Sequence, residues 1–125
     1  MTIKKKKVKQ MRMIHPNAAG IDIGAKEIYI AIPEERGENT VRRFDCFTDD
    51  LHEAAKWMKK HHIESIAMES TGVYWIPIYQ LFESYGFEQY LVNARHVKNV
   101  PGRKTDVKDS QWLQYLHTVG LLDSS

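Results

Sequence analysis

The feature that most constrains the fold of this chain is an acidic residue inside an apolar strand. Asp22 stands at the centre of the run Gly-Ile-Asp-Ile-Gly at positions 20–24, where the two isoleucines favour a buried, extended segment. A buried charge without a partner costs several kcal/mol, or its pKa shifts until the group is neutral. Because the neighbouring strand positions carry no Lys or Arg, we predict that a bound cation compensates Asp22. Gly20 and Gly24 share a face with Asp22 and are expected to leave room for a metal and a substrate backbone.

Three further acids stand beside apolar segments or chain breakers. Glu69 closes the apolar run at positions 66–68, and Asp106 and Asp109 follow the breaker pair Pro101-Gly102. A set of carboxylate oxygens favours Mg²⁺ or Mn²⁺ over softer metals. We predict that four acids hold one or two such ions, an arrangement suited to in-line phosphodiester chemistry. They are Asp22, Glu69, Asp106 and Asp109.

The sequence also allows these acids to be structural residues that bind no metal. Glu69 could be a solvated acid at a strand end, and Asp106 and Asp109 could be helix-start residues that gain from the helix dipole. We expect a helix over residues 105–119 that carries both aspartates on its apolar, sheet-facing stripe. Two acids on that stripe are better explained by metal binding than by helix capping.

Basic residues form two clusters, although the formal net charge is only +2. One runs from Lys4 to Arg12 and the other lies between residues 95 and 108. Both suit a polyanionic partner such as DNA or RNA, but the first is equally typical of a disordered solubilising tail. We predict phosphate contacts from five cations and base stacking from one aromatic residue: Arg95, Lys98, Arg103, Lys104, Lys108 and Trp75. The adjacent Tyr74 is predicted to be helix core.

The composition favours one intracellular domain. A chain of 125 residues with 42% hydrophobic residues can form one core. Cys46 is the only cysteine, so no intrachain disulfide forms and a reducing compartment is expected. No apolar segment follows the Lys run, and none is long enough to span a bilayer. We therefore expect a cytoplasmic protein with no membrane partner.

The hydrophobic pattern predicts five strands and three helices. The strands fall at 18–24, 27–33, 40–47, 63–69 and 87–92, and the helices at 50–62, 74–85 and 105–119. Asp50 and Glu53 are expected to form a capping box, and residues 93–104 to form a basic loop. A meander followed by β-α-β crossovers predicts the α/β, ribonuclease H-like fold, with a mixed five-stranded sheet and helices on its faces.

Three stretches of the chain are similar to a known family. They are Gly20–Gly24, Met68–Trp75 (Met-Glu-Ser-Thr-Gly-Val-Tyr-Trp), and the long run from Val92 through Asp109 into Gln111-Trp-Leu. Together they resemble the DEDD transposases of insertion-sequence family 110, RuvC-like recombinases associated with a bridge RNA. The likeness extends from about Ala18 to Leu122.

This resemblance implies a function and a division of the chain. Asp22, Glu69, Asp106 and Asp109 would form the DEDD site for Mg²⁺, with Mn²⁺ as a possible substitute, and would serve DNA cleavage and rejoining. The implied partners are DNA, a guide (bridge) RNA and further copies of the full-length protein, in the nucleoid-associated cytoplasm of a bacterium or archaeon. Residues 1–17 would be a basic arm and residues 18–125 the RuvC-like domain. The nucleophilic serine of the family belongs to a C-terminal domain that we expect to lie outside this chain.

Three other interpretations fit parts of the sequence. The run at positions 20–24 also resembles the first phosphate loop of actin-like and sugar-kinase ATPases, but no second glycine-rich loop follows. A self-contained RuvC or ribonuclease H-type nuclease would cleave without any other domain. A non-enzymatic binding module with decayed acids would bind nucleic acid and no metal.

Overall fold

The protein forms one mixed sheet in the strand order β3-β2-β1-β4-β5. The computed structural model describes residues 13–70 and 72–122. The strands are β1 (Ala18–Ile23), β2 (Glu27–Ala31), β3 (Val41–Asp45), β4 (Ser65–Ser70) and β5 (Glu88–Val92). All five expected strands are present, with ends shifted by one or two residues. The predicted α/β class and mixed five-stranded sheet are therefore confirmed.

The sheet combines an antiparallel meander with parallel crossovers. β1 pairs antiparallel with β2, and β2 pairs antiparallel with β3 at the edge. β4 lies parallel to β1, and β5 lies parallel to β4. β1 is central and, like β4, is largely buried on both faces, as expected for strands covered by helices on both sides.

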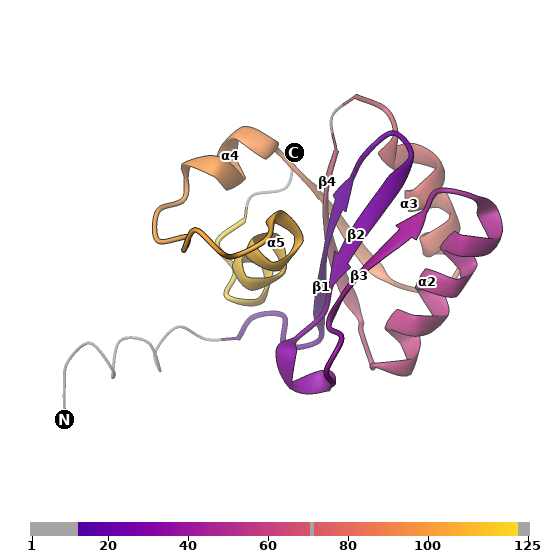
Figure 1. Ribbon diagram of the computed structural model, residues 1–125, viewed down its shortest axis with the longest axis horizontal. Helices are drawn as coiled ribbons and strands as arrows, with labels where there is room; N and C mark the ends of the chain where they lie inside the picture. The colour runs from indigo at the N-terminus through magenta and orange to yellow at the C-terminus, as the bar shows by residue number, and fades with distance from the viewer. Residues whose placement is uncertain (1–12, 71, 123–125) are drawn as a thin grey trace.

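Helices cover both faces of the sheet (Figure 1). α2 (Thr48–Lys60) and α3 (Trp75–Glu83) lie on one face, and α4 (Ala94–Asn99) and α5 (Asp109–Thr118) lie on the other. Side chains of β1 point alternately to the two faces. Ala19, Ile21 and Ile23 join the larger core beneath α2 and α3. The smaller core beneath α4 and α5 joins Ala67, Val92, Val97, Trp112, Leu113 and Leu116.

The predicted capping box at the start of α2 is wrong. The helix begins at Thr48, and the N-cap is Phe47, which makes no side-chain cap hydrogen bond. Asp50 lies inside the first turn with Asp49, where a negative charge gains from the helix dipole. The predicted end at His61-His62 is confirmed, since His62 adopts a positive φ of 63° directly after the helix.

The region expected to be a loop followed by a long helix is organised differently. Residues 94–99 form α4, whose N-cap Asn93 accepts a hydrogen bond from the Arg95 amide at 2.8 Å. α5 begins at Asp109, four residues later than predicted, and Gln111 Oε1 accepts a hydrogen bond from the Lys108 amide there. Asp106 therefore lies in a turn before α5, and the expectation that it occupies the helix's apolar stripe is wrong.

The described end of the expected basic arm packs on the domain. The amides of Ile14 and His15 both donate to the Thr118 carbonyl, at 2.7 and 3.1 Å. The His15 ring stacks on His117 with centroids 4.1 Å apart. Residues 1–12, which carry the first basic cluster, lie outside the described residues. None of the helices described is long and apolar enough to cross a membrane.

Candidate active site

Two of the predicted acids lie side by side on the sheet. Asp22 of β1 is the register partner of Glu69 on the parallel strand β4, and of Tyr29 on the antiparallel strand β2. Side-chain alternation places Asp22 on the face covered by α5, together with Ala67 and Val92 from the neighbouring strands. The sheet register thus forms a polar row, Tyr29-Asp22-Glu69, beneath the start of α5.

A glycine sets how closely α5 approaches this row. A Cβ on Gly20 would lie 2.4 Å from both the Gln114 nitrogen and the Ser110 carbonyl oxygen. Only glycine therefore lets the backbone of α5 rest on β1 at this point. The expectation that Gly20 leaves room for a metal is wrong, because the space is filled by the helix that carries Asp109.

Asp22, Asp106 and Asp109 line one cavity of about 400 Å³. Asp22 reaches it from the sheet, Asp106 from the turn before α5, and Asp109 from the first turn of α5. Arg103 and Lys108 also line its wall. Three of the four predicted acids, drawn from segments more than 80 residues apart in sequence, are therefore brought to one cavity.

The fourth acid, Glu69, is coupled to this cavity electrostatically. Burial raises the pKa of the Glu69 carboxyl above its usual range, and the charges of Asp22 and Asp109 raise it further. Burial likewise raises the pKa of Asp22, with a further contribution from Asp109. The charge of Asp109 thus acts on both strand acids, and the charge of Asp22 acts on Glu69.

Two predicted nucleic-acid-binding cations act on the same acids. Arg103 and Lys98 lower the pKa values of Asp22 and Glu69 and so partly offset the repulsion. Arg103 Nη2 lies 2.7 Å from Asp109 Oδ1, and its guanidinium also donates to the Val107 carbonyl at 2.6 and 3.1 Å. Arg103 thus folds the loop before α5 back onto itself and neutralises one acid of the site.

One residue at the cavity was not predicted as a site residue. Ser110 is 1% exposed and lines the cavity, and its Oγ has no hydrogen-bond partner among the described residues. A buried hydroxyl without a partner is costly, so it indicates a ligand or ordered water that the fold is prepared to receive. The only sequence signal was its position directly after Asp109.

The oxygen atoms at this site are of the kind that binds a hard divalent cation. They are carboxylate oxygens with surplus negative charge, beside an unpartnered buried hydroxyl. Within residues 13–70 and 72–122, however, no three His, Cys, Asp or Glu side chains are arranged closely enough to hold a metal ion. Arg103 occupies the cation's place at Asp109. Ligation by all the acids would therefore require side-chain rotations that bring them together.

The other residues predicted to contact nucleic acid lie on two different parts of the fold. Arg95, Lys98, Lys104 and Lys108 are exposed on α4 and on the segment between α4 and α5. Trp75 is half-buried, packs on the larger core and meets Tyr79 edge-on. Tyr74 is 48% exposed, so the expectation that Tyr74 is helix core is wrong.

The fold is similar to that of a solved RuvC structure. This is T. thermophilus RuvC in complex with a Holliday junction substrate, with a TM-score of 0.56 and 11% identity over 86% of this chain and 98% of that chain. A further match is the Fowlpox virus resolvase with its Holliday junction DNA, with a TM-score of 0.45 and 15% identity over 70% of this chain and 64% of that one. The first likeness, at such low identity, establishes the RuvC-like fold and nothing more.

The sequence itself matches a protein family. No curated protein matches the chain. A family model described as a transposase matches residues 19–118, which include all four predicted acids and both helices that cover the site. The chain therefore belongs to the DEDD transposase family of insertion sequence 110.

Proposed function

We propose that this domain cleaves DNA strands at the site formed by Asp22, Glu69, Asp106 and Asp109. These four acids would hold Mg²⁺, or Mn²⁺ in its place. The bound ions would supply activation of the attacking oxygen and stabilisation of the leaving oxygen. The observation that supports the proposal is that Asp22, Asp106 and Asp109 line one cavity, while Glu69 is the register partner of Asp22.

The four acids would have different roles because they lie on different elements. Asp22 and Glu69 stand on rigid central strands and would fix the site. Asp106 and Asp109 stand on the turn and the first turn of α5, where side chains can adjust as ligands arrive. In the metal-bound site, Ser110 would hold an ordered water through its hydroxyl, which has no partner among the described residues.

The proposed partner is nucleic acid. Arg95, Lys98, Arg103, Lys104 and Lys108 would contact phosphates, which position a strand without reading its sequence. DNA is favoured as the cleaved partner by the transposase family and by the RuvC structure, which holds a Holliday junction substrate. A guide RNA, a homo-oligomeric full-length protein and Trp75 as a base-stacking residue belong to the same proposal and rest on the family resemblance.

The domain division follows the same proposal. Residues 1–17 would form a basic arm, anchored at its end through His15, and residues 18–125 the catalytic domain. Strand rejoining would draw on the serine that the resemblance assigns to another domain. The family match argues against the actin-like ATPase alternative. The self-contained nuclease differs from the proposal only in needing no second domain.

Metal binding and strand cleavage by Asp22→Asn test the proposal together. We expect the chain to bind Mn²⁺, measured by electron paramagnetic resonance of free Mn²⁺, and the full-length protein to nick supercoiled DNA in Mg²⁺. Asp22→Asn and Glu69→Gln should each lose both properties while their circular dichroism is unchanged. The matched control is Asp49→Asn, an exposed acid on α2 at the other face of the sheet. Undiminished Mn²⁺ binding by both site variants would refute the metal site.

A further inference from the structure

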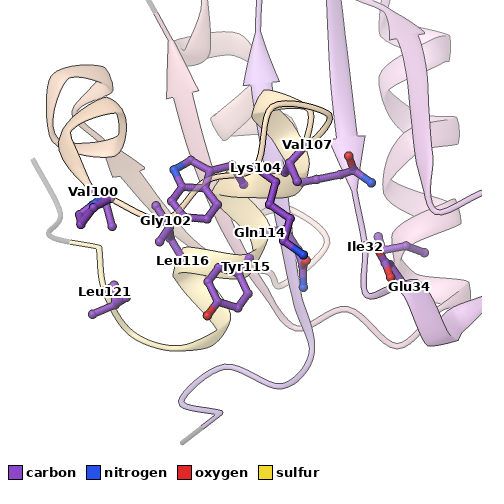
Figure 2. A pocket seen from close by; sticks show the side chains of 13 residues that line it. Ile32, Glu34, Val100, Gly102, Lys104, Val107, Gln114, Tyr115, Leu116 and Leu121 are labelled. Carbon is purple, nitrogen blue, oxygen red and sulfur yellow. The ribbon is translucent and has the colours of Figure 1, made fainter. Parts of the chain in front are cut away.

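A second cavity lies on the other side of the loop that carries Arg103. Its volume is about 540 Å³, within the range of small-molecule sites. It lies between the segment 100–107, α5 and the residues that follow β2, and Figure 2 shows Leu121 near one end and Ile32 and Glu34 at the other. Val107 lines both this cavity and the acidic one. The two cavities are therefore neighbours that share Val107 in their walls.

Two consecutive basic residues of the segment 100–107 line the two cavities. Arg103 lines the acidic cavity, whereas Lys104 lines the second one. A nucleic-acid strand held at the acidic site by Arg103 would bring its next phosphate near Lys104. The nucleotide attached to that phosphate would then lie at the mouth of the second cavity.

The walls of the second cavity suit a planar, polar-edged ring. Trp112 and Tyr115 stack with centroids 5.7 Å apart and planes 20° apart. Trp112 is fixed by its indole N–H, which donates to the Val97 carbonyl at 3.3 Å, whereas Tyr115 is 43% exposed. Figure 2 shows the Tyr115 ring between Leu121 and Gln114 along the cavity wall. An exposed aromatic ring held by a buried one is a stacking platform.

Two amide side chains supply hydrogen-bonding groups beside this platform. Gln111 uses its Oε1 for the Lys108 amide, and Gln114 uses its Nε2 for Thr118 Oγ1, each at 3.0 Å. Both side chains line the cavity, and these two hydrogen bonds leave the Gln111 NH₂ as a donor and the Gln114 side-chain carbonyl oxygen as an acceptor. Nucleobase edges carry donors and acceptors in this way. Glu34 on the opposite wall would repel a phosphate, so the backbone must stay on the Lys104 side.

We propose that this second cavity binds an unpaired nucleobase of the strand held at the acidic site. The inference rests on the proposed function, since Arg103 and Lys104 must first engage that strand. It assigns stacking to Tyr115, hydrogen bonds to Gln111 and Gln114, and the adjoining phosphate to Lys104.

The test compares a pentadeoxynucleotide with its abasic counterpart, which keeps every phosphate and lacks every base. In ¹⁵N NMR titrations of the chain, both should shift amides of the segment 95–108. Only the base-containing strand should shift the side-chain amides of Gln111 and Gln114. Stacking on one aromatic ring predicts that Tyr115→Ala weakens binding of the base-containing strand by roughly 5- to 150-fold. Affinity for the abasic strand should not change.

Two variants control for general effects of substitution. Tyr115→Phe should keep wild-type affinity because it keeps the ring. Tyr74→Ala removes a similarly exposed tyrosine on the other helical layer and should have no effect.

The outcomes separate this inference from the proposed function. Equal shifts and affinities for the two strands, with the loop responding, would overturn the base-binding cavity and leave phosphate contact intact. No response of segment 95–108 to either strand would overturn both. Concentration-dependent shifts of Tyr115 and Leu121 in the protein alone would indicate a protein interface and would also overturn the base-binding cavity.

Discussion

The guanidinium of Arg103 forms an ion pair with the carboxylate of Asp109, Nη2 to Oδ1, at 2.7 Å. Asp109 is also the residue whose charge raises the pKa values of Asp22 and Glu69. The same arginine can thus serve two purposes. In the metal-free protein, Arg103 partly neutralises the acidic site through its ion pair with Asp109. Once a metal binds Asp109, the guanidinium is free to bind a phosphate.

Arg103→Gln should therefore bind Mn²⁺ more tightly than the wild type in the absence of nucleic acid. Loss of a competing exposed ion pair is worth up to about 1 kcal/mol, or roughly 2- to 5-fold in affinity. DNA affinity should fall in the same variant, because a phosphate contact is lost. Isothermal titration at pH 8, where the carboxylates are ionised, measures the first effect, and fluorescence anisotropy measures the second.

Arg95→Gln is the matched control for this exchange. Arg95 is exposed on α4 and contributes to neither raised pKa, so its loss should weaken DNA binding and leave Mn²⁺ affinity unchanged. Weaker Mn²⁺ binding by Arg103→Gln would show that the arginine supports the metal site and does not compete with it.

Gly20→Ala should disrupt the site through the backbone of α5. The new Cβ would lie 2.4 Å from two backbone atoms that cannot rotate away, so the helix must move off β1. Overpacking of this kind costs about 1–3 kcal/mol, and the movement carries Asp109 away from Asp22. We expect a lower unfolding free energy in urea and weaker Mn²⁺ binding. Gly37→Ala, whose Cβ would lie 3.9 Å from its nearest neighbour, should show neither effect.

Ser110→Ala should stabilise the metal-free protein but weaken its binding of Mn²⁺. The buried Oγ has no partner in the described structure, and an unsatisfied buried hydroxyl costs about 1–3 kcal/mol. Its removal should raise the unfolding free energy of the metal-free protein by about 1 kcal/mol and weaken Mn²⁺ binding. Ser84→Ala, which deletes a hydroxyl that donates to the Leu81 carbonyl, should not stabilise the protein. A destabilised Ser110→Ala variant would mean that the hydroxyl has a partner.

The sheet could be predicted from the sequence because its signals are local. Alternating apolar residues in β2 and the short link at Ala25-Lys26 specify a hairpin, and the charge-poor β4 indicates a central strand. Asp22 and Glu69 were predictable as neighbours because parallel crossover strands end at one edge of the sheet.

The region between β5 and α5 could not be predicted because its signals conflict. α4 is short and strongly basic and buries only Val97, so it lacks an apolar stripe. The helix was predicted to start at residue 105, but it starts at Asp109, where Gln111 Oε1 accepts a hydrogen bond from the Lys108 amide. The approach of α5 to Gly20 and the Arg103–Asp109 pair are tertiary contacts, which no local pattern encodes.

The buried imidazole of His117 should make stability depend on pH. Its pKa is lowered from 6.5 to about 4, mainly by burial and also by the charge of the adjacent His15, while Glu88 partly offsets both. Ser65 Oγ lies 2.7 Å from its Nε2, and the Tyr90 ring lies against it. The unfolded chain thus binds a proton between pH 6.5 and about 4 that the folded protein rejects. The unfolding free energy should fall as pH falls through this window, by at most about 3 kcal/mol.

His117→Gln tests this dependence, because glutamine can still accept a hydrogen bond from Ser65 and does not titrate. The raised pKa values of Asp22 and Glu69 act in the opposite sense, since they favour the protonated, low-pH form of the folded state. The informative quantity is therefore the difference between variant and wild type in urea unfolding from pH 7.5 to 4. That difference should shrink as pH falls, and it should stay constant for His62→Asn, an exposed position with positive φ that asparagine tolerates. A constant difference for His117→Gln as well would mean that His117 takes up its proton without opening the fold.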